Sequence, residues 1–237
     1  MEILLQGTDW GVMHFKFIAY LIIFYTALAI VSAVYTFLLF SDWLKHKCLI
    51  NFVQNDSVEG VERVLKAGVD VNEKNVFGKT PLMGVVHYAK DVHILEHILG
   101  QADLNAVDEN GNTPLMVAAQ YNKNEQIVQT LIFEGANIHS LNYEGRSALM
   151  LAAAHNTNTA VVDILIHAGC RLNATDSEGR TPLMLAAQTN PNPQVVEVLL
   201  MRGADKTKRC SEGRTAYDYA QENEDLYQTQ AYSSLEV

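Results

Sequence analysis

The sequence predicts an all-α protein, with one N-terminal transmembrane helix followed by a solenoid of repeated helix-turn-helix-hairpin units. Two observations lead to this prediction. Close copies of the stretch Thr113–Ala119 recur at a nearly fixed spacing, and a long apolar segment precedes the first copy. A period of about 20 to 50 residues is typical of stacked supersecondary units. An apolar run of about 20 residues is typical of a membrane span.

The copies define a repeat of 33 or 34 residues. They begin at Thr80, Thr113, Ser147, Thr181 and Thr215. A glycine stands two residues before each start, where a turn favours a backbone without a Cβ atom. Further along each of the three central units, apolar residues three and four positions apart predict a second helix.

A second set of glycines, Gly135, Gly169 and Gly203, follows these second helices, at the position that often takes a left-handed conformation. The start, the turn glycine and the helix-ending glycine together resemble ankyrin repeats over roughly residues 43 to 226. The resemblance implies a stack of helix pairs that binds a partner on its concave face. It implies no particular partner, because ankyrin stacks bind many unrelated proteins.

The resemblance also divides the C-terminal part of the chain. Residues 42–77 are expected to form a divergent N-terminal repeat, since a terminal repeat has only one neighbour. Four fuller repeats follow at 78–212, and a polar capping half-repeat at 213–232. Residues 233–237 resemble the start of a rhinovirus-protease cleavage linker, so we interpret them as a linker remnant and leave them out of the fold prediction.

Residues 17–41 are predicted to form the transmembrane helix, after a short tail at 1–16. Phe17–Phe40 holds 24 consecutive residues without a charged residue, His, Asn or Gln. As a helix this segment would reach about 36 Å, which exceeds a hydrocarbon core of about 30 Å. Signal peptides have apolar regions of only about 7 to 15 residues, so we expect a retained span in contact with the lipid bilayer.

Two further expectations concern this span. Ala29, Ser32 and Ala33 form a strip of small residues, which favours close packing against a helix of a membrane-protein partner. Lys45 and Lys47 follow the span, whereas among the lysines and arginines only Lys16 precedes it. This bias favours a cytoplasmic position for the repeats, with an extracytoplasmic or periplasmic position as the alternative.

Charge narrows the class of partner. The net charge is −10, and the residues after Asp56 carry 14 lysines and arginines against 23 aspartates and glutamates. Nucleic-acid binders carry a basic stripe, so we expect no nucleic-acid partner. The acidic repeats favour a basic or mixed-charge protein, although the charge could equally serve solubility alone.

No enzymatic centre, metal or cofactor is expected. Cys48, Cys170 and Cys210 show no Cys-x-x-Cys spacing and are odd in number, which indicates neither a disulfide framework nor a zinc site. Residues 93–97 match the His-x-x-Glu-His motif of inverted zinc peptidases. Alignment of the repeats places His93 and Glu96 on a variable outer surface, with no third ligand evident, so a metal site on His93 and His97 is kept only as an alternative.

The concave face and the hairpin tips are the expected partner-binding surface, because they combine aromatic or apolar residues with acids, as an interface core combines with a charged rim. The alternative is that Phe77 and Tyr143 merely cover the hairpins. The residues expected to bind the partner are Val76, Phe77, Tyr88, Asp108, Glu109, Tyr121, Leu141, Tyr143, Glu144, His155, Asp176 and Glu178.

The sequence therefore predicts a membrane-anchored interaction module or scaffold, and not an enzyme. We expect an accessory or regulatory subunit that captures a protein partner at the membrane, where its effective concentration is raised. One alternative is an immunity-like binder that neutralises an effector or toxin. A second alternative is a periplasmic stress or redox factor with a histidine metal site.

Overall fold

The computed structural model describes residues 58–227 and 229–236, together with Tyr25, Leu28 and Ser32. The chain divides into two units, Met1–Lys47 and Cys48–Val237. In the first unit the three described residues are helical and exposed. The remainder of the predicted span, with Ala29 and Ala33, lies outside the described residues, as do the tail and residues 42–57. Among the helices that are described, none has the length and apolar character needed to cross a membrane.

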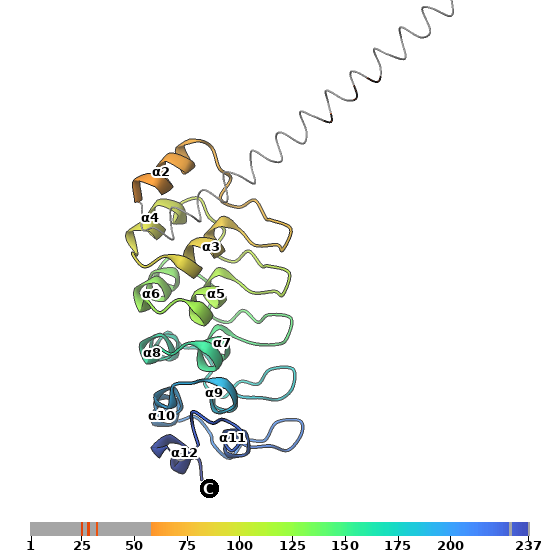
Figure 1. Cartoon of the computed structure of the whole chain (residues 1–237), viewed down its shortest axis with the longest axis vertical. Coiled ribbons are helices and arrows are strands. Elements are labelled where there is room, and N and C mark those ends of the chain that lie inside the picture. The colour runs from red at the N-terminus through yellow and green to blue at the C-terminus, as the bar shows by residue number, and fades with distance from the viewer. Residues whose placement is uncertain (1–24, 26–27, 29–31, 33–57, 228, 237) are drawn as a thin grey trace, which may run out of the picture. The chain divides into compact units, whose positions relative to one another are not determined.

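The second unit is a stack of paired helices, and its described residues contain no strand. One layer, the inner helices, consists of α3 (Pro81–Tyr88), α5 (Pro114–Tyr121), α7 (Ala148–His155), α9 (Pro182–Thr189) and α11 (Ala216–Ala220). The other layer, the outer helices, consists of α2 (Val58–Lys66), α4 (His93–Leu99), α6 (Glu125–Phe133), α8 (Thr159–His167), α10 (Pro193–Met201) and α12 (Gln230–Leu235). Figure 1 shows the hairpins, called fingers below, projecting from the inner layer on the side away from the outer helices.

Each inner helix begins because the first residue of the repeated stretch caps it. The Thr113 hydroxyl oxygen accepts a hydrogen bond from the Met116 N–H at 3.3 Å. Proline at the first helical position needs no such partner, because it has no N–H. The Ser147 hydroxyl replaces threonine in the next repeat and accepts from the Met150 N–H at 3.3 Å. The repeated stretch therefore specifies the helix start locally.

The core lies between the two layers. The four repeated methionines that follow the Thr-Pro-Leu or Ser-Ala-Leu starts are at most 1% exposed, and their flexible side chains fill space in the core. The outer helices add their apolar face, with Ile127, Val128 and Leu131 of α6 fully buried. The helix pairs thus share one large hydrophobic cluster that runs through the repeats, and Met150, Ala154 and Leu185 form a second, smaller one.

A ladder of buried asparagines joins successive repeats at the C-terminal ends of the inner helices. Each asparagine side-chain N–H₂ donates to two backbone carbonyls of the preceding repeat, at 2.8–3.2 Å. Its side-chain oxygen accepts the N–H two residues further on. The members are Asn122, Asn156, Asn190 and Asn223. These bonds satisfy helix-end carbonyls that would otherwise be buried without a donor.

The C-terminal residues differ from the prediction. Residues 230–235 form α12, and Leu235 is fully buried in the core. The Lys206 ammonium donates to the backbone carbonyls of Ser234 and Glu236. Part of the segment interpreted as a linker remnant therefore packs on the folded domain, because α12 covers apolar surface of α10 and α11.

Substitutions of two glycines are expected to lower the free energy of unfolding by different amounts. Gly135 and Gly179 both have a left-handed φ, of 96° and 76°. A Cβ atom at Gly135 would meet no atom within 4 Å, whereas at Gly179 it would lie 2.9 Å from the Ser211 nitrogen. We expect Gly135→Ala to lower the free energy of unfolding by about 1 kcal/mol. Gly179→Ala should cost clearly more in urea denaturation, and equal costs would contradict this packing argument.

Candidate partner-binding surface

The fingers are shaped by one Asp or Asn side chain each. The Asp108 carboxylate accepts the N–H groups of Asn110 and Asn112 at 2.9 and 2.8 Å, and Asn142 makes the equivalent bonds in the next finger. Asp108 and Asp176 are only 4% and 7% exposed. The prediction that these two acids lie on an exposed rim is therefore wrong. Their carboxylates close the turns, and burial follows from that role.

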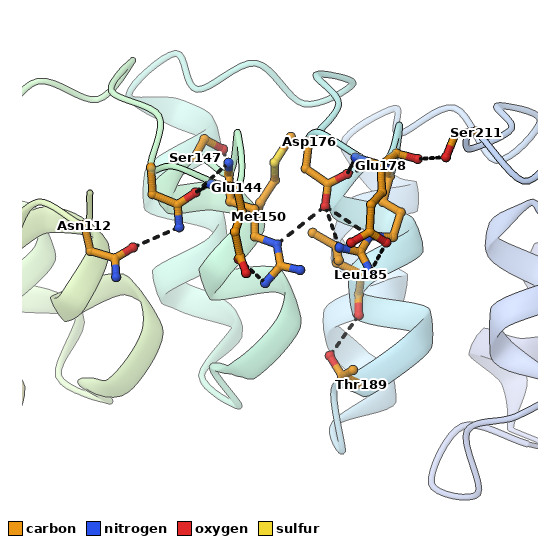
Figure 2. Close-up of polar contacts among 12 residues, drawn as sticks. Asn112, Glu144, Ser147, Met150, Asp176, Glu178, Leu185, Thr189 and Ser211 are labelled. Atoms are coloured by element: carbon orange, nitrogen blue, oxygen red, sulfur yellow. Dashed lines mark hydrogen bonds and ion pairs between the residues drawn. The ribbon is translucent and has the colours of Figure 1, made fainter. Parts of the chain in front are cut away.

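A network of charges crosses two neighbouring fingers (Figure 2). The Asp176 carboxylate lies 2.9 Å from an Arg180 nitrogen and 3.5 Å from Arg146 Nε. Each arginine also holds one exposed glutamate, since Arg146 contacts Glu144 and Arg180 contacts Glu178, both at 2.9 Å. The exposed acids of these fingers are thus held by arginines that are themselves anchored on a buried carboxylate.

Backbone hydrogen bonds connect one finger tip to the next. The N–H of Glu109 donates to the Phe77 carbonyl at 3.1 Å, and the N–H of Tyr143 donates to the Asn110 carbonyl at 3.0 Å. Equivalent bonds of 3.0 Å join Ser177 to Glu144 and Ser211 to Glu178. The backbones of the tips therefore form a regular array. A partner that binds them would lose little free energy to the ordering of these loops.

The predicted apolar tip residues are exposed. Val76 is 91% exposed and Tyr143 is 74% exposed, and more than half of the Phe77 and Leu141 surfaces is also accessible. Glu109, Glu144 and Glu178 are exposed beside them. The structure thus places these predicted residues on one array of tips, with large apolar groups next to acids.

The predicted residues at the ends of the inner helices are also exposed, and a residue that sequence reasoning missed lies beside them. Tyr88, Tyr121 and His155 are accessible to solvent. The His87 ring lies 4.3 Å from the Tyr88 ring and stacks on Tyr121 at 4.5 Å, with 28° between the planes. Gln120, Ala154 and Gln188 occupy the position of His87 in later repeats. No repeated signal therefore marked this residue.

His87 and His155, in the last turns of α3 and α7, are expected to make the stability depend on pH. Burial lowers the pKa of His87 and of His155 below its usual value of 6.5, and Lys79 and Arg146 respectively lower it further. The unfolded chain therefore binds these protons more readily. The stability that the neutral rings contribute is complete above pH 6.5 and is lost as the pH falls through the lower folded values. We expect the melting temperature to fall between pH 7 and pH 5, and to fall less in His87→Gln.

The histidines of the motif at residues 93–97 face different carboxylates. His93 Nδ1 lies 3.4 Å from Glu96 of its own helix, and His97 Nδ1 lies 3.7 Å from Glu62 of α2. In the described part of the chain, no three His, Cys, Asp or Glu residues are grouped as a metal site requires. Cys170 and Cys210 are buried and free, and burial raises the pKa of Cys170 to about 11, which disfavours its thiolate. Cys48 lies outside the described residues.

Comparison with known families agrees with this geometry. A family model described as ankyrin repeats, in three copies, matches residues 49–142, 115–210 and 149–228. The chain belongs to the ankyrin-repeat family. The fingers and inner helices described above are therefore those of an ankyrin-repeat stack.

One solved structure extends the comparison. The ankyrin chain is similar to a chain in the complex of the Bd0816 predatory endopeptidase from Bdellovibrio bacteriovorus with the immunity protein Bd3460. The TM-score is 0.65 and the sequence identity is 25%, and the match covers 80% of this chain and 96% of that one. The search of curated proteins gave no match.

Proposed function

We propose that this protein is a non-enzymatic binding module that captures a protein partner on its fingers and inner helices. The observation that carries the proposal is the group of exposed aromatic and apolar side chains on the rigid array of tips, above all Phe77 and Tyr143. Aromatic side chains of this kind dominate the binding energy of protein interfaces. Acids beside them, such as Glu109 and Glu144, provide a polar rim.

We further propose that the module is anchored in a membrane as an accessory or regulatory subunit. The support is the apolar segment at 17–40 of the sequence, whose length suits a membrane span. Lysines after this segment favour a cytoplasmic position for the repeats. Extraction of host membranes with alkaline carbonate should leave the protein in the membrane pellet. Its release into the supernatant would contradict the anchor.

A second candidate function is that of an immunity-like binder that neutralises an effector. The specific observation in its favour is the similarity to a chain of the endopeptidase–immunity complex, which covers nearly the whole of that chain. In this case the partner would be an enzyme whose activity is blocked when it binds the fingers. The partner's identity separates the two candidates, because one expects a membrane complex and the other a hydrolytic effector.

The test is capture of the partner from native membranes by the intact protein, with mass spectrometry of what co-purifies. The double variant Phe77→Ser/Tyr143→Ser should keep its melting temperature and lose most of the captured partner, because truncating interface aromatics costs about 2 kcal/mol or more. The matched control is Phe133→Ser/Met201→Ser, which removes two apolar side chains that are 86% and 76% exposed on outer helices. Equal capture of the partner by both double variants would show that the binding site lies outside the fingers.

A further inference from the structure

A groove at the ends of α3 and α5 combines aromatic rings with lysines. His87, Tyr88 and Lys90 come from one repeat, and Tyr121 and Lys123 come from the next. The rings of His87 and Tyr121 stack on each other and so connect the two repeats. Tyr88, Lys90, Tyr121 and Lys123 are all exposed. The groove therefore offers flat apolar surfaces with ammonium groups at their edge.

Lysine stands at this position of the repeat only toward the N-terminal end of the stack. Lys90 and Lys123 occupy the same position of successive repeats, where the following repeats have Thr157 and Pro191. Two acids lie beside the lysines, since Glu125 also lines the groove and Asp91 follows Lys90 in the sequence. Asp91 accepts the His93 N–H at 3.0 Å, and Glu125 accepts a hydrogen bond from the Asn158 side chain at 3.0 Å. Among the described residues no hydrogen bond or ion pair of the Lys123 ammonium is found.

The surroundings restrict which anion fits. The finger tips carry Glu109, Glu144 and Glu178, and the chain has a net charge of −10. A long polyanion such as a nucleic acid would be repelled by these charges. A short acidic segment can place its carboxylates at the two lysines without approaching the glutamates of the finger tips. Aromatic rings at the groove favour an aromatic side chain in the same segment, since offset rings attract one another.

We infer that this groove binds an acidic peptide segment of the protein partner, with an aromatic side chain against Tyr88 and Tyr121 and carboxylates at Lys90 and Lys123. The inference rests on the proposed function, because it describes part of the same binding face. It adds a second contact that is separate from the finger tips and opposite to them in charge.

The test uses short fluorescein-labelled peptides and the intact protein, with binding followed by fluorescence anisotropy. The first peptide carries several Asp and Glu residues around one Phe. The second replaces the acids by Asn and Gln, and the third replaces Phe by Ser. We expect the first peptide to bind at least about tenfold more tightly than either of the others. Its binding should weaken as salt rises toward about 1 M. Equal binding of the first two peptides would overturn the inference.

Variants locate the binding site. Lys123→Glu and Tyr121→Ser should each weaken binding of the first peptide by about tenfold. The matched controls are Arg171→Glu, which makes the same charge change elsewhere, and Tyr227→Ser, which removes a tyrosine that is also about half exposed. Melting curves establish that each variant is folded. If the controls weaken binding as much as the groove variants, the peptide binds elsewhere and the inference fails.

The outcomes also separate this inference from the proposed function. Loss of partner capture in Phe77→Ser/Tyr143→Ser, with no selective binding of the acidic aromatic peptide, would uphold the function and overturn the groove. Selective peptide binding that Lys123→Glu abolishes, with capture unaffected by the finger variants, would uphold the groove and overturn the role of the fingers.

Discussion

Asn156→Ala is expected to lower the free energy of unfolding by about 3 to 5 kcal/mol. The side chain of Asn156 donates to the carbonyls of Ala119 and Asn122 at 2.9 and 2.8 Å and accepts the Asn158 N–H at 2.9 Å. Asn156 is only 2% exposed, so water cannot replace these bonds easily. Each buried polar group left without a partner costs about 1 to 3 kcal/mol. Urea denaturation followed by circular dichroism measures the loss.

Asn110→Ala is the matched control for this variant. Asn110 is exposed at a finger tip, and its backbone carbonyl, not its side chain, accepts the Tyr143 N–H. Its truncation should change stability by no more than about 0.5 kcal/mol. Comparable losses for the two variants would show that the asparagine ladder contributes little. Because repeats are stabilised mainly by their neighbours, the effect of Asn156→Ala should extend to the α5–α7 boundary.

Asp176→Ala is expected to cost about 3 to 5 kcal/mol, because it leaves two arginines without their buried anion. The Arg180 side chain is 10% exposed and the Arg146 side chain 19%, whereas the Asp176 side chain is 1% exposed. The variant also removes the acceptor for the N–H groups of Glu178 and Arg180. Thermal and urea denaturation measure the loss of stability, and the exposed ion pairs of Glu144 and Glu178 cannot replace the missing carboxylate.

Two further variants separate charge from turn geometry. Asp176→Asn keeps an acceptor for the backbone N–H groups but removes the charge, so it should recover part of the stability. Glu178→Gln alters an ion pair whose acid is 63% exposed, and should cost no more than about 1 kcal/mol. A cost for Glu178→Gln that equals that of Asp176→Ala would contradict the central role of the buried carboxylate.

Several features of the fold can be predicted from residues that are close together in the sequence. The cap at Thr113 depends on a hydrogen bond between residues only three positions apart in the sequence. The left-handed conformation of Gly135 depends on the backbone of that one residue. The asparagine ladder was missed, although Asn122, Asn156 and Asn190 recur 34 residues apart in the sequence. Attention to spaced polar residues, and not only to apolar ones, would have found it.

Other features depend on contacts between repeats, which local patterns do not specify. Sequence alone marked Asp108 and Asp176 as exposed tip acids, but both are buried where they close their turns, and Asp176 also pairs with Arg146 of the preceding finger. The pairing of His87 with Tyr121 arises because stacking brings residues 34 positions apart together. The repeat period, the helix starts and the exposed aromatics are thus contained in the sequence, since they rest on local hydrogen bonds and hydrophobic spacing. The buried charge network, the groove and the packing of α12 depend on the tertiary structure, because burial and charge pairing arise only when distant segments meet.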